Sequence, residues 1–445
     1  MSDTAAKEQD EPKEETSEQR VPEQSAEISD NIPVKEYEAQ IPPIPRVSIQ
    51  AFCEQQITAD VLQVVSEDRR LAKAHVNVQL GGAKAALSFY QNAPTPNLII
   101  LEILQEQNTI LHELDRLAEV CDSGTRVIVI GSVNDILMYR ELLRRGVSEY
   151  LVSPVSPMQV MESISSFYND PETSPVGQVM AFIGAKGGSG SSSVCHNTAW
   201  LITEAIQSDV VIADMDLPFG TAGLDFNQDP VQGVFDALSA PERLDAVLLD
   251  RLLSKCSERL SLFSAPGTLD REYDIEASSC DIMLDVVRQN VPYVMLDLPH
   301  MWTSWTKEVL FQADEIVITA EPDLASLRNA KNLVDVLKGE RKNDRPPCLV
   351  LNQVNMPKRP EISSKDFANA VELEPSVVID FDAELFGTAS NNGQMIDEIS
   401  KKSKASDQFR TLAFLLTHRT DQKTETKSSM FAPLLSKLNR KKNSK

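Results

Sequence analysis

A short glycine-rich segment at residues 186–193 constrains the fold of this chain more than any other feature. It reads KGGSGSSS, follows an apolar run at 179–184 and precedes a stretch of helical character at 191–203. Glycines let the backbone turn tightly and point its N–H groups inward, and the positive end of the following helix faces the same space. A strand, a glycine-rich loop and a helix in this order predict a cradle for phosphate groups.

The region around this loop alternates between apolar strands and amphipathic helices, which is typical of an α/β domain. We therefore predict a mostly parallel sheet with helical crossovers over residues 177–420. Its further strands are predicted at 210–213, 260–263, 293–296, 315–319, 348–352 and 377–379. Its further helices are predicted at 240–256, 277–289, 324–337 and 364–371.

A second α/β pattern precedes it, over residues 46–170. Five strands alternate with five helices there, which predicts a flavodoxin-like, doubly wound sheet. A polar segment at 171–176 is predicted to link the two domains. The strands are expected at 46–52, 75–80, 97–103, 126–131 and 148–152, and the helices at 59–71, 82–91, 108–121, 135–146 and 158–168.

Composition limits the functions open to the chain. Its 445 residues carry a formal net charge of -23, which repels phosphate backbones and makes a nucleic-acid partner unlikely on charge grounds. Residues 1–45 are acidic and almost free of aromatics, so we predict a disordered tail. No apolar run approaches the roughly 18 residues of a membrane span. The six cysteines are scattered, which indicates reduced thiols in the cytoplasm and no metal cluster.

The other end of the chain, 421–445, becomes basic. Apolar residues occur there at helical spacing, so one interpretation is an amphipathic helix at 430–442 that lies on an anionic membrane surface. The other interpretation is a disordered basic tail that keeps the protein soluble, and the sequence leaves both open. The apolar positions are Phe431, Leu434, Leu435 and Leu438.

The glycine-rich loop departs from the usual G-x-x-x-x-G-K-[ST] pattern, because Ser191 stands where the lysine is expected. Lys186 opens the loop instead, and in this the loop resembles the deviant ParA/MinD class of P-loop ATPases. The resemblance implies that ATP and Mg²⁺ are the cofactors and that Lys186 reaches across a nucleotide-dependent homodimer to the partner's phosphates. The residues expected to contact nucleotide are Gly187, Gly188, Ser189, Gly190, Ser191, Ser192 and Ser193.

A serine in place of the loop lysine weakens the contact with phosphate. Replacing an ammonium by a hydroxyl about 4 Å from a phosphate forfeits on the order of 1–4 kcal/mol. Hydrolysis suffers more than binding, because the lost charge meets the charge that develops on the transferred phosphate. We therefore expect retained or weak ATP binding and slow or absent hydrolysis.

Other segments match the same class in order. The strand at 211–216 ends in D-x-D, and the resemblance implies that Asp214 and Asp216 organise Mg²⁺ and the attacking water; an exposed acidic turn is the alternative. The strand at 294–299 resembles a Walker B strand, in which Asp297 holds Mg²⁺ together with the Ser192 hydroxyl. Asn352 matches a strand-end asparagine that reads adenine, unless it only caps its own turn.

Within this class of ATPases, the sequence matches one branch more closely than the others. The run DLPFGTAGLDF at 216–226 and the loop with its helix at 187–197, together with the preceding α/β domain, are similar to the CpaE/TadZ branch of the MinD superfamily. The resemblance covers residues 46–420. It implies a Flp/Tad pilus assembly and localisation factor that contacts the secretin and the motor ATPase. The implied location is the cytoplasm, at the pole or peripherally at the inner membrane.

The first domain resembles a response-regulator receiver. PNLIILE at 96–102 is similar to strand three, whose last position carries the phosphoacceptor Asp, and YLVSP at 150–154 is similar to the end of strand five. Here Glu102 occupies the acceptor position, Ser153 replaces the lysine, and the acidic pair after strand one is missing. We predict a degenerate receiver that serves for contacts; an unrelated small α/β domain is the alternative.

Three other functions are weighed against a pilus assembly factor. A ParA-like DNA-partition ATPase needs a basic surface, a metabolic P-loop enzyme needs the loop lysine, and a phosphorelay protein needs an acceptor Asp. His196 and His300 lack a neighbouring nucleophile, so we expect packing or hydrogen bonding from both. Trp302 and Trp305 are expected in the core more than at an interface.

Overall fold

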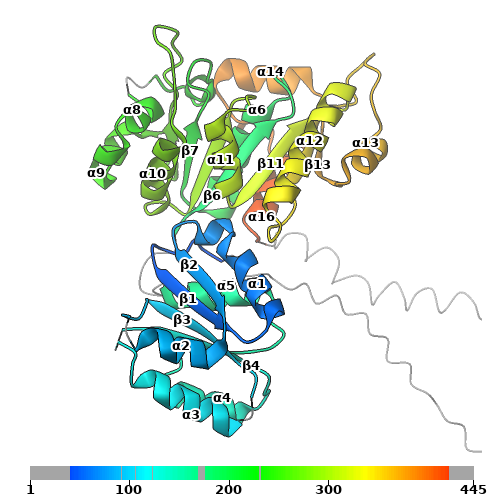
Figure 1. Cartoon of the computed structure of the whole chain (residues 1–445). Coiled ribbons are helices and arrows are strands. Elements are labelled where there is room, and N and C mark those ends of the chain that lie inside the picture. The colour runs from blue at the N-terminus through cyan, green and yellow to red at the C-terminus, as the bar shows by residue number, and fades with distance from the viewer. Residues whose placement is uncertain are drawn as a thin grey trace, which may run out of the picture. The chain divides into compact units, whose positions relative to one another are not determined.

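We describe a computed structural model of the chain (Figure 1). The residues described are 41–91, 93–105, 107–122, 124–168, 176–229 and 232–419. The acidic tail before residue 41, most of the predicted linker and the segment predicted as a membrane-binding helix lie outside them.

The first sheet is five-stranded with the order β2-β1-β3-β4-β5, and all its strand pairs are parallel. This order is the flavodoxin-like one, so the predicted fold class is confirmed. Apolar residues of α1 and α5 pack on one face of the sheet, and those of α2, α3 and α4 pack on the other. The strands are β1 (Ser48–Cys53), β2 (His75–Leu80), β3 (Leu98–Ile103), β4 (Arg126–Gly131) and β5 (Glu149–Val152). The helices are α1 (Gln56–Ser66), η1 (Arg69–Leu71), α2 (Gly82–Tyr90), α3 (Gln107–Ala118), α4 (Ile136–Arg144) and α5 (Pro157–Tyr168).

Ordered packing begins before the predicted end of the acidic tail. Ile41 and Ile44 are buried against the core of the first sheet, and Ile44 N donates to Arg70 O at 2.8 Å. Residues 41–45 therefore belong to the first domain, because their two isoleucines bury apolar surface there.

The second sheet is eight-stranded with the order β13-β12-β11-β6-β10-β7-β9-β8, and only the pairing of β8 with β9 is antiparallel. The predicted mostly parallel sheet is confirmed. Its central strand β6 (Gln178–Gly184) lies between β10 and β11, so neighbouring connections leave its carboxyl end in opposite directions; ligands of such sheets bind at this point. The other strands are β7 (Val210–Asp214), β8 (Ser254–Lys255), β9 (Leu260–Phe263), β10 (Tyr293–Leu298), β11 (Glu315–Ala320), β12 (Cys348–Val354) and β13 (Pro375–Asp380).

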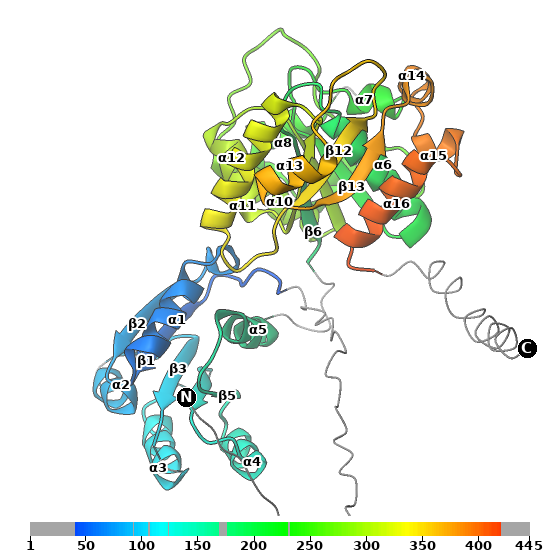
Figure 2. The same ribbon diagram turned by 90° about the vertical axis from the view of Figure 1, so that its right-hand side faces the viewer.

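Helices cover both faces of the second sheet (Figure 2). Apolar residues of α10, α11, α12 and α13 pack on one face, and those of α6 and α16 pack on the other. The helices are α6 (Ser191–Leu201), η2 (Ile202–Ile206), α7 (Ala222–Asp225), α8 (Val234–Ser239), η3 (Pro241–Arg243), α9 (Ala246–Leu252), α10 (Ala277–Arg288), α11 (Ser304–Gln312), α12 (Leu324–Glu340), α13 (Ser364–Val371), α14 (Ala383–Asn392), α15 (Ile396–Ile399) and α16 (Lys404–Leu416).

The single helix predicted at 240–256 is wrong. The segment instead forms η3, the separate helix α9 and the short strand β8. The break has a local cause: the Asp245 side chain accepts a hydrogen bond from Leu248 N at 2.8 Å and so starts a new helix. Leu253 is then extended and leads the chain into β8.

Residues 41–419 fall within one compact unit, and ion pairs connect the η1 turn to the second sheet. Arg69 Nε donates to Asp344 Oδ2 at 2.8 Å, and Arg69 Nη1 donates to Asp314 Oδ1 at 3.1 Å. All three side chains are largely buried, so breaking one pair would leave an uncompensated charge. Among the residues described, none of the helices is both long and apolar enough to cross a bilayer.

Candidate functional site

The glycine-rich loop connects β6 to α6 at the carboxyl end of the central strand. Gly188 and Gly190 have φ angles of +84° and +85°, which side chains rarely tolerate. Gly190 is also the residue before the first turn of α6, and a Cβ on it would lie 2.4 Å from the Asn352 amide nitrogen. Glycine is therefore required there both by backbone conformation and by close packing.

Two serine hydroxyls in this loop are buried without a hydrogen-bond partner among the described residues. They belong to Ser189 and Ser191, and Gly190 supplies no side-chain cap to the start of α6. Buried polar atoms are normally paired, and the first N–H groups of a helix need acceptors. Phosphate oxygens would satisfy both needs, so the loop fits the nucleotide that the sequence predicts.

Asn352 fixes the loop from the neighbouring part of the sheet. Its amide nitrogen donates to Ser189 O at 2.8 Å, and Gln353 Nε2 donates to Gly188 O at 3.0 Å. Both residues lie in β12, and Asn352 is buried. The predicted adenine contact of Asn352 stays a prediction, but the side chain has a structural task that sequence analysis missed.

Lys186 is held by two acidic side chains that follow β11. Its Nζ lies 2.5 Å from Asp323 Oδ2 and 3.2 Å from Glu321 Oε1. The hydrogen bond to Asp323 is the main reason that the pKa of Lys186 is raised. Glu321 also accepts a hydrogen bond from Arg359 Nη1 at 2.6 Å. These carboxylates were not predicted, although an E-P-D run directly after a strand of the same sheet was a signal for them.

Two predicted metal-binding carboxylates, Asp214 and Asp297, lie opposite each other on the adjacent strands β7 and β10. Both are buried. Burial and then the nearby Asp297 charge raise the pKa of Asp214 to about 7. Two buried carboxylates at one level favour a cation between or above them.

Asp214 also shapes the segment that follows β7. Its Oδ2 accepts from Ala222 N at 3.1 Å and its Oδ1 from Asp216 N at 3.2 Å. Asp216 is less buried, and desolvation is the main cause that raises its pKa. The two carboxylates of the D-x-D pair differ in burial: Asp214 is fully buried and accepts from two backbone amides, while the less buried Asp216 accepts from Phe219 N at 3.3 Å.

His196 contributes a buried imidazole that sequence analysis did not assign to the site. Its Nδ1 lies 2.8 Å from Asp225 Oδ2, and its Nε2 lies 3.4 Å from Asp297 Oδ2. Burial opposes protonation, but these two carboxylates outweigh it and raise the pKa of His196 to about 10. The expected hydrogen-bonding role is thus met, with the imidazole ring between the Asp225 and Asp297 carboxylates.

The donor set fits Mg²⁺ held together with nucleotide phosphates. Within the described ranges, no group of three or more His, Cys, Asp or Glu side chains could hold a metal by itself. Ser192 lies four residues before His196 in α6, and residues at this spacing share one face of a helix. Ser192, Asp214 and Asp297 would share the ion with phosphate oxygens, as Mg²⁺ sites in nucleotide-binding proteins do.

Several large apolar side chains lie exposed near the candidate site. Phe219 and Leu224 follow β7 and are 67% and 73% exposed, and Trp302 after β10 is 52% exposed. Trp305 is buried in the core under α11, so the expected core position holds for Trp305 and is wrong for Trp302. Exposed apolar residues near a functional site indicate a contact surface.

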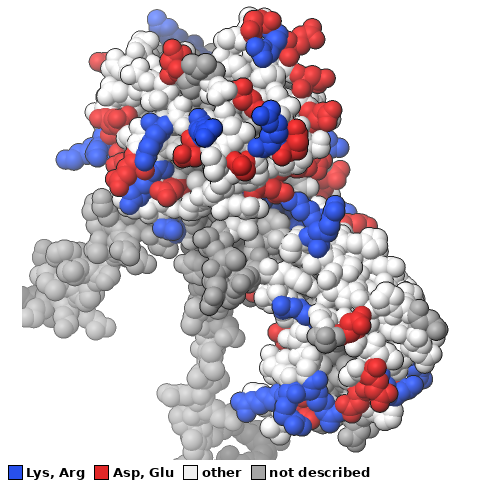
Figure 3. Space-filling model, turned by 90° about the vertical axis from the view of Figure 1, so that its left-hand side faces the viewer, with Lys and Arg blue, Asp and Glu red and all other residues white. Residues whose placement is uncertain are grey.

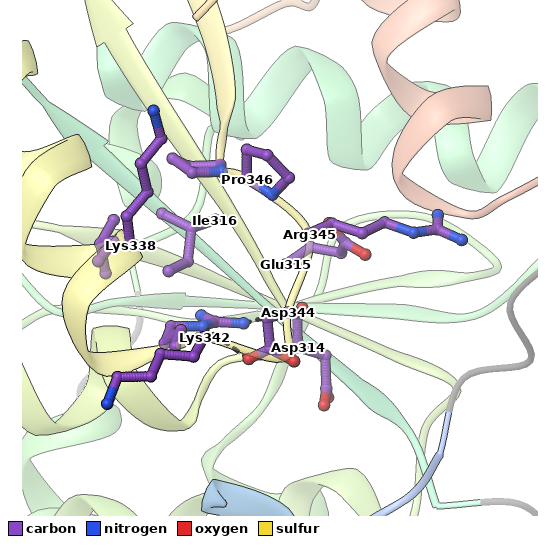
Figure 4. Close-up of a pocket in the computed structure, with 11 residues that line it drawn as sticks. Asp314, Glu315, Ile316, Lys338, Lys342, Asp344, Arg345 and Pro346 are labelled. Atoms are coloured by element: carbon purple, nitrogen blue, oxygen red, sulfur yellow. Dashed lines mark hydrogen bonds and ion pairs between the residues drawn. The ribbon is translucent and has the colours of Figure 1, made fainter. Parts of the chain in front are cut away.

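A separate surface pocket lies at the other end of β11 and lacks the features of a phosphate cradle (Figure 4). Acidic and basic side chains alternate around it, among them Asp314, Lys338 and Lys342. Arg341 Nε donates to Asp344 Oδ2 at 2.9 Å, so charges there are already paired. None of the predicted nucleotide residues lines this pocket.

Glu102 lies at the end of β3, as the receiver resemblance implies, and is buried. Its Oε2 accepts from Glu54 N at 2.7 Å and Gln55 N at 2.8 Å, and its Oε1 accepts from Thr58 Oγ1 at 2.5 Å. The carboxylate therefore satisfies backbone donors at the start of α1 and has no open side for a reaction.

Comparison with known proteins agrees with this geometry. No family model matches the chain. The septum site-determining protein MinD of Bacillus subtilis is 22% identical over 252 residues, which cover 54% of this chain and 88% of that protein. A solved pilus assembly protein CpaE of Caulobacter crescentus is 48% identical and covers 29% of this chain and 98% of its own, with a TM-score of 0.29.

A solved ParA family ATPase of Chlorobium tepidum is 26% identical and covers 55% of this chain and 100% of its own, with a TM-score of 0.49. The CpaE protein therefore matches a smaller part of this chain than the ParA family ATPase does. The chain is therefore similar in sequence to CpaE pilus assembly proteins and to MinD and ParA family proteins.

Proposed function

We propose that this chain is a CpaE-like assembly factor that binds ATP with Mg²⁺, dimerises around it and positions a Flp/Tad secretion machinery. The observation that carries the proposal is the loop itself: a cradle with two unpaired buried hydroxyls, a serine at the usual lysine position, and Lys186 at its start. The 48% identity to a CpaE protein supports the pilus role. Hydrolysis is slow or absent in this proposal.

In this proposal, separate residues bind the phosphates, the Mg²⁺ ion and a water molecule. The backbone N–H groups of 187–193 bind phosphate oxygens, and the Ser192 hydroxyl with Asp214 and Asp297 holds Mg²⁺, which neutralises phosphate charge when bound. Asp216 orients a water at the edge of the site. Ser191 offers a hydroxyl where other members offer an ammonium, so the charge that develops during hydrolysis finds less compensation.

Lys186 is the residue that would contact the phosphates bound by a second copy of the chain. In the free chain its ammonium is paired with Glu321 and Asp323, and its side chain is 28% exposed. To reach phosphates in a partner it must leave these carboxylates. Exchanging two partly exposed ion pairs for phosphate contacts costs little, because such pairs contribute about 0–1 kcal/mol each.

Surface charge supports a protein partner over DNA. On the face shown in Figure 3, basic and acidic side chains are interspersed over the second-sheet domain. A DNA-partition ATPase needs a continuous basic surface. The location we propose is the cytoplasm, at the pole or peripherally at the inner membrane. The basic segment proposed to reach the membrane lies outside the described residues.

Nucleotide-dependent dimerisation tests the proposal. Light scattering of the full chain should give a monomer without nucleotide and a dimer with ATP and Mg²⁺. Lys186→Ala should stay monomeric, while Lys401→Ala, which removes an exposed lysine between α15 and α16, should behave as the wild type. A wild-type chain that binds no ATP, or a Lys186→Ala variant that dimerises normally, would overturn the proposal.

A further inference from the structure

His196 joins two parts of the site that are far apart in the sequence. It lies on α6, and its side chain is 1% exposed. One ring nitrogen contacts Asp225 at the end of α7, and the other lies 3.4 Å from Asp297 in β10. The Nδ1 contact is a hydrogen bond that fixes the ring, whereas Nε2 is buried at ion-pair distance from Asp297 without a hydrogen bond of its own among the described residues.

The short helix α7 is held at both of its ends, at its start by Asp214 and at its end by His196. At its start, Ala222 N donates to Asp214, and at its end Asp225 pairs with His196. Between these anchors, Leu224 projects from the surface with 73% of its area exposed. Movement of either carboxylate is therefore transmitted to an exposed apolar element.

We propose that His196 is a positioning residue that couples Asp297 to α7, so that cation binding at Asp297 and the arrangement of α7 depend on each other. The coupling is reciprocal, since a ligand that favours one arrangement is favoured by it. A cation held by Asp297 would compete with His196 for this carboxylate, so the contact at Nε2 would weaken and the ring would be freer to move relative to Asp225. The exposed Leu224 then reports the state of the buried site to a partner.

The part of this proposal that concerns cation binding at Asp297 rests on the proposed function. The part that concerns the contact of His196 with α7 does not. The two amide residues separate the two ring contacts: an asparagine side chain reaches the position of Nδ1, and a glutamine side chain reaches that of Nε2. His196→Asn thus retains a donor for Asp225 and loses the contact to Asp297. His196→Gln does the reverse.

Hydrogen exchange of the full chain without nucleotide tests the α7 arm. Exchange over residues 217–228 should rise in His196→Gln and stay near the wild-type level in His196→Asn. His75→Gln, which changes an exposed histidine in β2, is the control and should leave this segment unchanged. Equal exchange in all four proteins would overturn the proposal.

A double-mutant cycle tests the coupling itself. Asp225→Asn should shift the Mg²⁺ concentration for half-maximal binding of a fluorescent ATP analogue by about fivefold in the wild-type background. The same change should have no effect in the His196→Asn background, where the link to Asp297 is cut. A purely structural role would lower the melting temperature and leave this Mg²⁺ concentration unmoved, which would contradict the proposal. Absence of ATP binding by the wild type would instead refute the proposed function, and hydrogen exchange would still decide the role of His196.

Discussion

Asp323 contacts Lys186 with one carboxylate oxygen and begins α12 with the other. Oδ2 lies 2.5 Å from Lys186 Nζ, and Oδ1 accepts a hydrogen bond from Ser326 N at 2.8 Å. The position of the lysine is therefore tied to the start of a helix 137 residues away in the sequence.

Asp323→Asn should make dimerisation easier. Asparagine is as good a helix cap as aspartate, so α12 keeps its start while the lysine loses its closest counter-charge. The ATP concentration that gives half-maximal dimer by light scattering should fall by up to about fivefold, as expected for one partly exposed ion pair. An unchanged or higher concentration would show that the pair does not hold Lys186 back.

Ser191→Lys should restore the usual loop charge. The Ser191 hydroxyl is buried and unpaired in the described structure, so the new ammonium would extend into the phosphate cradle. We expect ATP affinity to rise about tenfold or more, and hydrolysis to increase further, since a close charge contributes on the order of 1–4 kcal/mol. Titration with a fluorescent ATP analogue and a phosphate-release assay measure both. Ser166→Lys, which adds a lysine at an exposed position of α5 in the first domain, is the control and should not raise either.

Asn352→Ala should loosen the loop and weaken nucleotide binding. The variant leaves the Ser189 carbonyl without its partner, which costs about 1–2 kcal/mol, or roughly tenfold in affinity. Gln353→Ala removes the more exposed hydrogen bond to Gly188 and should have a smaller effect. Isothermal titration of both variants with ATP and Mg²⁺ gives the ranking, and the reverse order would contradict this role of Asn352.

Glu102→Ala should destabilise the first domain. It would remove the acceptor of three donors at the start of α1, and leaving them unpaired costs on the order of 2–4 kcal/mol in the free energy of unfolding. Glu102→Gln keeps the shape and one acceptor oxygen, so its loss should be smaller. Chemical denaturation monitored by circular dichroism measures both. Exposed Glu67→Ala serves as the control and should change little.

The strands, the parallel character of both sheets and the glycine-rich loop were accessible from sequence, because parallel strands are buried on both faces and read as apolar runs. The break at Asp245 was missed because helical periodicity continues through it and only the side-chain cap ends the pattern. Ile41 and Ile44 were missed because an acidic, proline-rich context surrounds them.

The candidate site was only partly predictable for another reason. The cradle residues are consecutive, and the D-x-D and Walker B carboxylates end apolar strands, so local pattern finds them. Glu321, Asp323 and the partners of His196 act through contacts between segments 29 to 137 residues apart. Such contacts depend on the register of neighbouring strands, which no local pattern contains.

The hydrogen bonds that Glu102 accepts bear on whether the first domain can receive a phosphorylation signal. A receiver changes state when a phosphoryl group is added at this position, yet here the carboxylate is saturated by the Glu54 and Gln55 amides and the Thr58 hydroxyl. We therefore expect that the first domain receives no phosphoryl signal at Glu102 and that a signal would reach the protein through the second domain.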